Sequence, residues 1–96
     1  MRPVNFELCK NFYERLVFEE ITARAAGTPL AFDADALEDV ACLALNQLPV
    51  RYVRFAVDAS FYMEQKERVE LEGAVAEAVS RAMAFVSANP RETGVR

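Results

Sequence analysis

The stretch from Asp39 to Arg54, D-V-A-C-L-A-L-N-Q-L-P-V-R-Y-V-R, contains two hydrophobic periods separated by one proline. As far as Leu48, apolar residues recur at three- and four-residue steps, which is the spacing of a helix with a buried face. Pro49 cannot continue that helix, because it has no N–H and its ring clashes with the preceding turn. Beyond it, apolar side chains recur at every second position, as in a strand. The stretch therefore predicts a buried helix that leads directly into an extended segment over residues 51–57.

Helical spacing is also present on the amino-terminal side of this stretch. Apolar residues that recur along residues 4–26 predict a first helix, with Asn5 as its N-cap. The connection over residues 27–34 contains two large apolar side chains, Leu30 and Phe32, which we expect to fold back onto the core.

The second helix is predicted over about residues 36–48, and it is the most apolar of the three. Asp35 is the expected N-cap, and Glu38 stands three residues later, so the two form an acidic variant of the capping box. Such a cap contributes about 1 kcal/mol to helix stability.

The extended segment cannot stand alone, because its backbone N–H and C=O groups need hydrogen-bond partners. Two partners are open: the continuation of the chain near Phe61-Tyr62, or the same segment of a second subunit.

A third helix is predicted over residues 64–89, ending before Pro90, and it carries two apolar rows. The first row is Val69, Gly73, Ala76, Val79 or Ser80, Met83 and Val86, and the second is Leu71, Val75, Ala78, Ala82 and Phe85. We expect the first row to pack on its own subunit and the second on a partner chain. The predicted fold is therefore mainly α, with three principal helices and a short strand, in a homodimer built on the third helix or on the strand.

The chain has 96 residues, which corresponds to one domain over residues 1–90 with a short polar tail over residues 91–96. Its apolar fraction of 53% is high for that length, which also favours a homodimer in which a second chain covers part of the surface. No signal peptide or membrane span is recognisable, so a cytoplasmic location is expected. Cys9 and Cys42 fall in apolar helical settings and are expected to be buried free thiols, with a disulfide as the alternative.

The charge pattern and composition exclude several classes of function. A net charge of −4 without a basic run argues against nucleic-acid binding. Histidine is absent, and with it the commonest general base and metal ligand. The sequence also has no glycine-rich phosphate loop and no serine or cysteine in an elbow-like setting, so we do not expect an enzyme.

Two segments resemble a known family. Asn11–Ile21, N-F-Y-E-R-L-V-F-E-E-I, matches a recurrent Asn-x-x-Glu-x-Leu-Val run followed by acidic residues. Asp39–Val53 matches an Ala/Leu-rich helix followed by Leu-Asn, then Leu-Pro and Arg/Lys-Tyr-Val. Both patterns are those of the late-competence ComFB family, which the chain resembles over roughly residues 11–54 and more loosely as far as Pro90-Arg91.

In many members of that family the region after the first helix is cysteine-rich and resembles a metal site. The corresponding residues here, Phe32–Ala36, include no cysteine, and Cys42 is the one thiol nearby. A structural zinc needs about four nitrogen or sulfur ligands, and a calcium ion needs six or more oxygens. We therefore expect no metal and no cofactor.

The resemblance implies a cytoplasmic receptor for cyclic di-GMP or a related cyclic dinucleotide. The choice of residues rests on chemistry: the guanidinium groups of Arg51, Arg54 and Arg68 suit phosphates and guanine edges. Tyr52 is one of several aromatic residues that can stack on a base, and Asp58 can accept hydrogen bonds from a guanine. These five residues are the candidate binding site.

Two alternatives remain open at this point. Arg51 and Arg54 can instead be solvated or paired to Glu14 or Glu38, with the aromatic residues in the core. The chain is then an interaction or regulatory domain without a small ligand, connected with competence or motility control. The receptor, in contrast, would pass its ligand-bound state to an unidentified protein partner.

Overall fold

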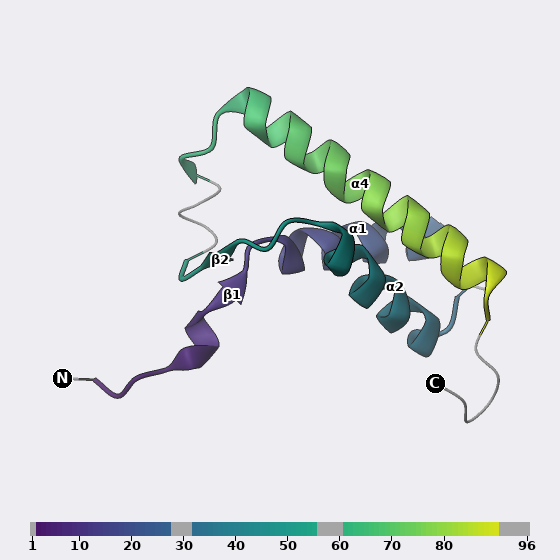
Figure 1. The fold of residues 1–96 in the computed structure, drawn as a ribbon, viewed down its shortest axis with the longest axis horizontal. Coiled ribbons are helices and arrows are strands. Elements are labelled where there is room, and N and C mark those ends of the chain that lie inside the picture. Colours follow the sequence, from purple (N-terminus) through teal and green to yellow (C-terminus); the bar gives the residue numbers. More distant parts are fainter. Residues whose placement is uncertain (1, 28–31, 56–60, 91–96) are drawn as a thin grey trace.

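A computed structural model of the chain describes residues 2–27, 32–55 and 61–90, and its architecture is mainly α, as the sequence predicts. The helices are α1 (Tyr13–Gly27), α2 (Ala34–Gln47) and α4 (Gln65–Ala88), with the short 3₁₀-helix η1 (Phe6–Leu8) before them, and the strands are β1 (Lys10–Asn11) and β2 (Tyr52–Val53). Helix α4 lies across α1 and α2, and the two strands pair at one end of the helices (Figure 1). The bounds of α4 confirm the third predicted helix to within one residue at each end.

The first long helix begins later than predicted, at Tyr13 rather than at residue 4. Asn5 does cap a helix, but that helix is η1, since its side chain accepts the N–H of Glu7 at 3.0 Å. Asn11 then starts α1: its side-chain oxygen accepts the N–H of Tyr13 at 3.3 Å, while its own N–H donates to Glu14 at 3.4 Å. The two bonds form a variant of the capping box, in which the Asn11 side chain accepts the N–H two residues on rather than three. Asparagine side chains that bond the local backbone in this way interrupt a helix.

Within the chain, the extended segment pairs with the amino-terminal strand rather than with the continuation near Phe61-Tyr62, so that prediction was wrong. Pairing with the same segment of a second subunit stays a prediction. β1 and β2 are antiparallel, with Lys10 opposite Val53 and Asn11 opposite Tyr52. The strand is also shorter than predicted, because β2 ends at Val53. Residues 56 and 57 of the predicted strand lie outside the described ranges.

Helix α2 is capped by Asp33, not by Asp35, and so begins two residues earlier than predicted. The Asp33 carboxylate accepts the N–H of Ala36 at 2.8 Å. Asp35 instead lies in the first helical turn, where a negative charge is favoured by the helix dipole. Phe32 and Leu37 stand in the positions of a hydrophobic staple, and both pack against the core, which fixes where the chain enters the helix. The packing of Phe32 confirms that part of the prediction, whereas Leu30 lies outside the described residues.

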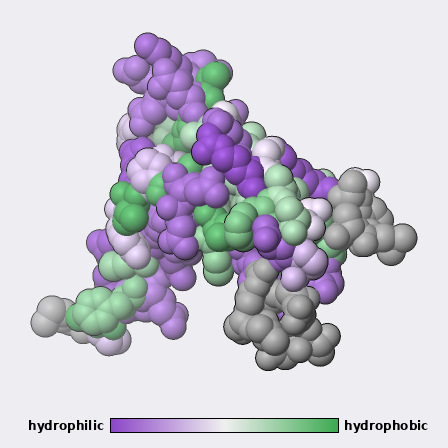
Figure 2. Space-filling view, turned by 45° about the vertical axis from the view of Figure 1, so that its right-hand side comes forward, coloured by the Kyte–Doolittle hydropathy of each residue, from purple (hydrophilic) through white to green (hydrophobic). Residues whose placement is uncertain are grey.

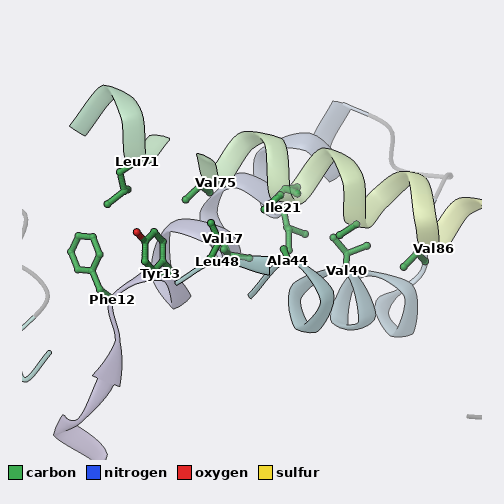
Figure 3. Close-up of a cluster of buried hydrophobic side chains, with 13 residues drawn as sticks. Phe12, Tyr13, Val17, Ile21, Val40, Ala44, Leu48, Leu71, Val75 and Val86 are labelled. Carbon is green, nitrogen blue, oxygen red and sulfur yellow. The ribbon is translucent and has the colours of Figure 1, made fainter. Parts of the chain in front are cut away.

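The core is formed between α4 on one side and α1 and α2 on the other (Figure 3). Its buried members are Phe12, Tyr13, Val17, Ile21, Val40, Ala44, Leu48, Leu71, Val75, Ala78, Val79, Ala82 and Val86. Small residues such as Ala44, Ala78 and Ala82 are fully or almost fully buried, which is what lets the helices approach closely.

The assignment of the two rows on α4 was wrong. Leu71, Val75, Ala78 and Ala82, which were expected to face a partner chain, are buried within the chain itself. Val69, from the row expected to face inward, is 57% exposed. Val79 and Val86 are buried with the other row, so α4 has one broad inner face rather than two narrow ones. Spacing alone showed two rows but not which of them faces α1 and α2.

Polar contacts also join α1 to α4, through Arg24. Its guanidinium donates to the Ser80 hydroxyl at 2.6 Å and to the backbone oxygen of Ala76 at 3.0 Å, and pairs with Glu20 at 2.6 Å. Its side chain is 31% exposed. At least three partners surround this partly buried guanidinium, which makes Arg24 a structural arginine.

Both cysteines are exposed free thiols, which corrects the expectation that they are buried. Cys9 lies just before β1 and Cys42 lies on α2. Helix α2 buries Val40 and Ala44 and leaves Cys42 exposed to solvent.

Candidate ligand-binding site

The pairing of the two strands fixes the backbone of Arg51, the residue just before β2. The N–H of Phe12 donates to the carbonyl oxygen of Arg51 at 2.6 Å. The N–H of Arg51 donates to the side-chain oxygen of Asn11 at 3.4 Å. Because both backbone groups of Arg51 are held by the segment that opens α1, the guanidinium is presented from a fixed point.

The side chain of Arg51 lies between an aromatic ring and a carboxylate. Its guanidinium carbon is 5.1 Å from the centre of the Phe12 ring, and its Nη1 is 3.3 Å from Oε1 of Glu67 in the first turn of α4. A guanidinium is weakly hydrated and stacks well on a ring. Phe12 itself is only 3% exposed and lies beside Tyr13 and Leu71 in the core (Figure 3). The ring on which the Arg51 guanidinium stacks is therefore held in place by the core.

The carboxylate partner of Arg51 is not one of those considered from the sequence. Glu14 accepts the N–H of Asn11 in the capping box, and Glu38 is exposed on α2. Glu67 was missed because the ion pair joins residues of two different elements, 16 positions apart, and no helical or strand spacing relates them.

Arg54 and Tyr52 are exposed, on the far side of β2 from the core. Tyr52 is 68% exposed, whereas its neighbour Val53 packs against the core. The guanidinium carbon of Arg54 is 4.8 Å from the centre of the Phe55 ring, which is itself 50% exposed. The alternation of side chains along β2 accounts for the division between Tyr52 and Val53, whereas Arg54 lies in a bend after the strand.

The structure thus brings only part of the predicted site together. Arg51 is held against α4, where Arg68 directly follows its partner Glu67 and is half-buried. Tyr52 and Arg54 are close to Arg51 along the chain but face outward. Asp58 lies outside the described residues.

Two further aromatic side chains lie just before the first turn of α4. Phe61 is 79% exposed and Tyr62 is 81% exposed, and their rings contact each other edge to face with centres 5.2 Å apart. Exposed rings of this kind can stack on a flat base.

A surface groove on α1 was not found from the sequence. It has a volume of about 670 Å³ and is bordered by β1 and by Phe12, Phe18 and Thr22 of the α1 segment. A second hollow of about 410 Å³, between α1 and α2, also includes Phe18, which is 47% exposed. The signal in the sequence was Phe18 itself, a large aromatic residue off the buried stripe of the first helix. Figure 2 shows that apolar residues reach the surface in separate patches among hydrophilic ones.

Within residues 2–27, 32–55 and 61–90, no three acidic or cysteine side chains lie close enough together to hold a metal ion. In the same parts of the chain, none of the helices combines the length and the apolar character that a membrane span requires.

Comparison with known proteins gives one family. The model of the family described as late competence development protein ComFB matches residues 10–90, which include β1, all three long helices and β2. No curated protein matches the sequence. The match covers most of the 96 residues and includes both segments that carried the resemblance. The chain belongs to the ComFB family of late competence development proteins.

Proposed function

We propose that this protein is a non-catalytic regulator that binds a cyclic dinucleotide as a homodimer, with cyclic di-GMP as the favoured ligand. The ligand-bound protein then signals to a protein partner. Its family indicates a competence-related regulatory role. The family match does not include the identity of the ligand, the homodimer or the protein partner, and these three points are what we propose.

The observation that carries the ligand proposal is the placement of Arg51. The backbone of this residue is fixed by two hydrogen bonds, its guanidinium rests on Phe12, and 43% of its side chain remains exposed. A guanidinium that is held in place but still accessible loses little entropy when it binds a phosphate. Arg54, exposed three residues later, offers a second planar donor for the second phosphate or for a guanine edge.

Exposed aromatic residues in the β2 segment and just before α4 support a ligand with flat bases. Tyr52, Phe55, Phe61 and Tyr62 are each at least half exposed. Stacking of a base on an aromatic ring contributes about 1–3 kcal/mol. A ligand with two purine bases and two phosphates uses both kinds of group.

The same surface supports the homodimer. Val50 is 73% exposed, close to the exposed rings of Tyr52 and Phe55, and Val69 is 57% exposed on α4. Large apolar side chains that are this exposed on a small chain support a contact with a second chain. A dimer through this region would bring two copies of Arg51 and Arg54 towards one ligand with two phosphates.

Isothermal titration with cyclic di-GMP tests the ligand proposal directly. We expect saturable binding that weakens with added salt, because the ligand carries two phosphates. The double variant Arg51→Ala/Arg54→Ala should lose that binding, whereas Arg81→Ala, which removes an exposed arginine paired with Glu77 elsewhere on α4, should retain it. Binding by the double variant equal to that of the wild type, with circular dichroism showing a folded protein, would place the ligand elsewhere.

A second candidate function is protein binding without a small ligand, and the α1 groove favours it. Phe18 is 47% exposed between two apolar hollows, which is a common arrangement at protein contacts. If no cyclic dinucleotide gives a heat of binding, this reading replaces the first.

A further inference from the structure

We infer that Glu67 is a positioning residue that competes with the ligand: it holds Arg51 in the ligand-free protein and must be displaced when a phosphate of the ligand binds. This inference rests on the proposed function. It adds Glu67 to the proposed site and states that breaking the Arg51–Glu67 ion pair is part of the free energy of ligand binding.

The geometry of the Arg51 side chain carries the inference. Among the described residues, its guanidinium has two neighbours, the Phe12 ring on one face and the Glu67 carboxylate at Nη1. A bidentate contact with a phosphate uses two N–H groups on one edge of the planar guanidinium. Glu67 presents the same kind of anionic oxygen to the same guanidinium, so it and a phosphate compete. A phosphate bound beside an unmoved Glu67 would also meet a like charge.

The exposure of the pair shows that such an exchange is possible. The side chains of Arg51 and Glu67 are 43% and 50% exposed, and exposed ion pairs contribute little to stability. Arg24 is the contrast within the same chain. It is 31% exposed and bonds Glu20, Ser80 and a backbone oxygen at once, so an incoming anion would have to break three contacts. Among the residues that the structure describes, the Arg51 side chain has one polar partner to give up, Glu67.

The location of Glu67 connects this exchange to the rest of the molecule. Glu67 lies in the first turn of α4, and its pair with Arg51 ties that turn to the segment entering β2. The first turns of α4 extend beyond α1 and α2 (Figure 1). Displacement of Glu67 therefore removes a restraint on this end of α4 in the same step that seats the ligand. An acidic residue in a first turn is favoured by the helix dipole with or without Arg51, so the helix itself persists.

The test is a double-mutant cycle read by isothermal titration with cyclic di-GMP. We expect Glu67→Gln to lower the dissociation constant about two- to fivefold, the range that loss of an exposed ion pair allows. Glu70→Gln removes the same charge from an exposed position three residues further along α4 and should change the affinity less. In an Arg51→Ala background, the effect of Glu67→Gln should vanish. That disappearance is the readout that a purely structural or long-range electrostatic role would not give.

The outcomes separate the two proposals. Binding by the wild-type protein decides the proposed function, and the ratio between wild type and Glu67→Gln decides the inference. Equal or weaker binding by Glu67→Gln would overturn the inference, as would a gain that persists without Arg51. No binding by either protein would overturn both.

Discussion

The side-chain oxygen of Asn11 lies 3.4 Å from the backbone nitrogen of Arg51 and accepts its hydrogen, across 40 residues of sequence. The same oxygen accepts the N–H of Tyr13 at 3.3 Å and so caps α1. One short side chain thus sets the start of the first long helix and the position of the arginine on which the candidate site depends.

Replacing Asn11 with alanine should therefore weaken the fold and the site together. We expect the free energy of unfolding to fall by about 1–2 kcal/mol, since loss of an N-cap alone typically costs about 1 kcal/mol. Urea denaturation followed by circular dichroism measures it. Asn5→Ala is the matched control, because Asn5 caps only the three-residue helix η1. Equal losses in both variants would contradict the role given to Asn11.

Replacing Ala82 with glutamate should unfold the chain. Ala82 has no exposed surface within a single chain, so the new carboxylate would be placed in the core between α4 and its neighbours without a partner. We expect loss of the cooperative thermal transition, which circular dichroism at 222 nm follows. Ala84→Glu introduces the same side chain at an exposed position of the same helix and should fold normally. A folded, monomeric Ala82→Glu protein would instead indicate that Ala82 faces another subunit.

Arg54 is expected to make a bidentate contact with the ligand through its guanidinium. Arg54→Ala should weaken cyclic di-GMP binding about tenfold to a hundredfold, which corresponds to about 1.5–3 kcal/mol for a charge-assisted contact. Arg54→Lys should restore only part of that affinity, because an ammonium keeps the charge but not the planar fork. Full recovery with lysine, measured by titration calorimetry, would reduce the role of Arg54 to that of a general positive charge.

The oligomeric state can be measured without any ligand. We expect light scattering to give the mass of a dimer at micromolar concentration, and we expect Phe61→Ser/Tyr62→Ser to shift the equilibrium towards monomer, since both rings are about four-fifths exposed in one chain. Phe18→Ser, on the α1 surface, is the matched control. A monomeric wild-type protein would remove the homodimer from the proposal, and dissociation by Phe18→Ser alone would move the interface to α1.

The helices were predictable because each is determined locally. The apolar spacing up to Leu48 and the proline at position 49 determine where α2 ends, and Pro90 stands just after α4. The pairing of β1 with β2 was not predictable in this way, because it joins Lys10 to Val53 and the period of a two-residue strand carries no information about its partner. The capping box of Asn11 and Glu14 was visible as Asn-x-x-Glu, but the longer apolar run around it favoured a helix that began earlier.

The site was predicted as residue types rather than as an arrangement. Composition and alternation identified Arg51, Tyr52 and Arg54 as neighbours along an extended segment. The structure adds which side faces the core: Val53 packs against it, whereas Tyr52 is exposed. Which arginine would meet α4 depended on how the third helix crosses the first two. That crossing is decided by the packing of Val75, Ala78 and Val79 against α1 and α2, which sequence spacing does not determine.

The two exposed thiols make the native chain suitable for site-specific spectroscopic labelling. Cys9 adjoins β1 and Cys42 lies on the outer side of α2, and the sequence contains no other cysteine. Exposed thiols react readily with maleimide dyes or nitroxides, and neither position belongs to the core. A donor and acceptor pair attached at these two sites would report the distance between the amino-terminal strand and the second helix in solution. Energy transfer or double electron–electron resonance can then follow that distance as a ligand is added, with no cysteine having to be introduced or removed.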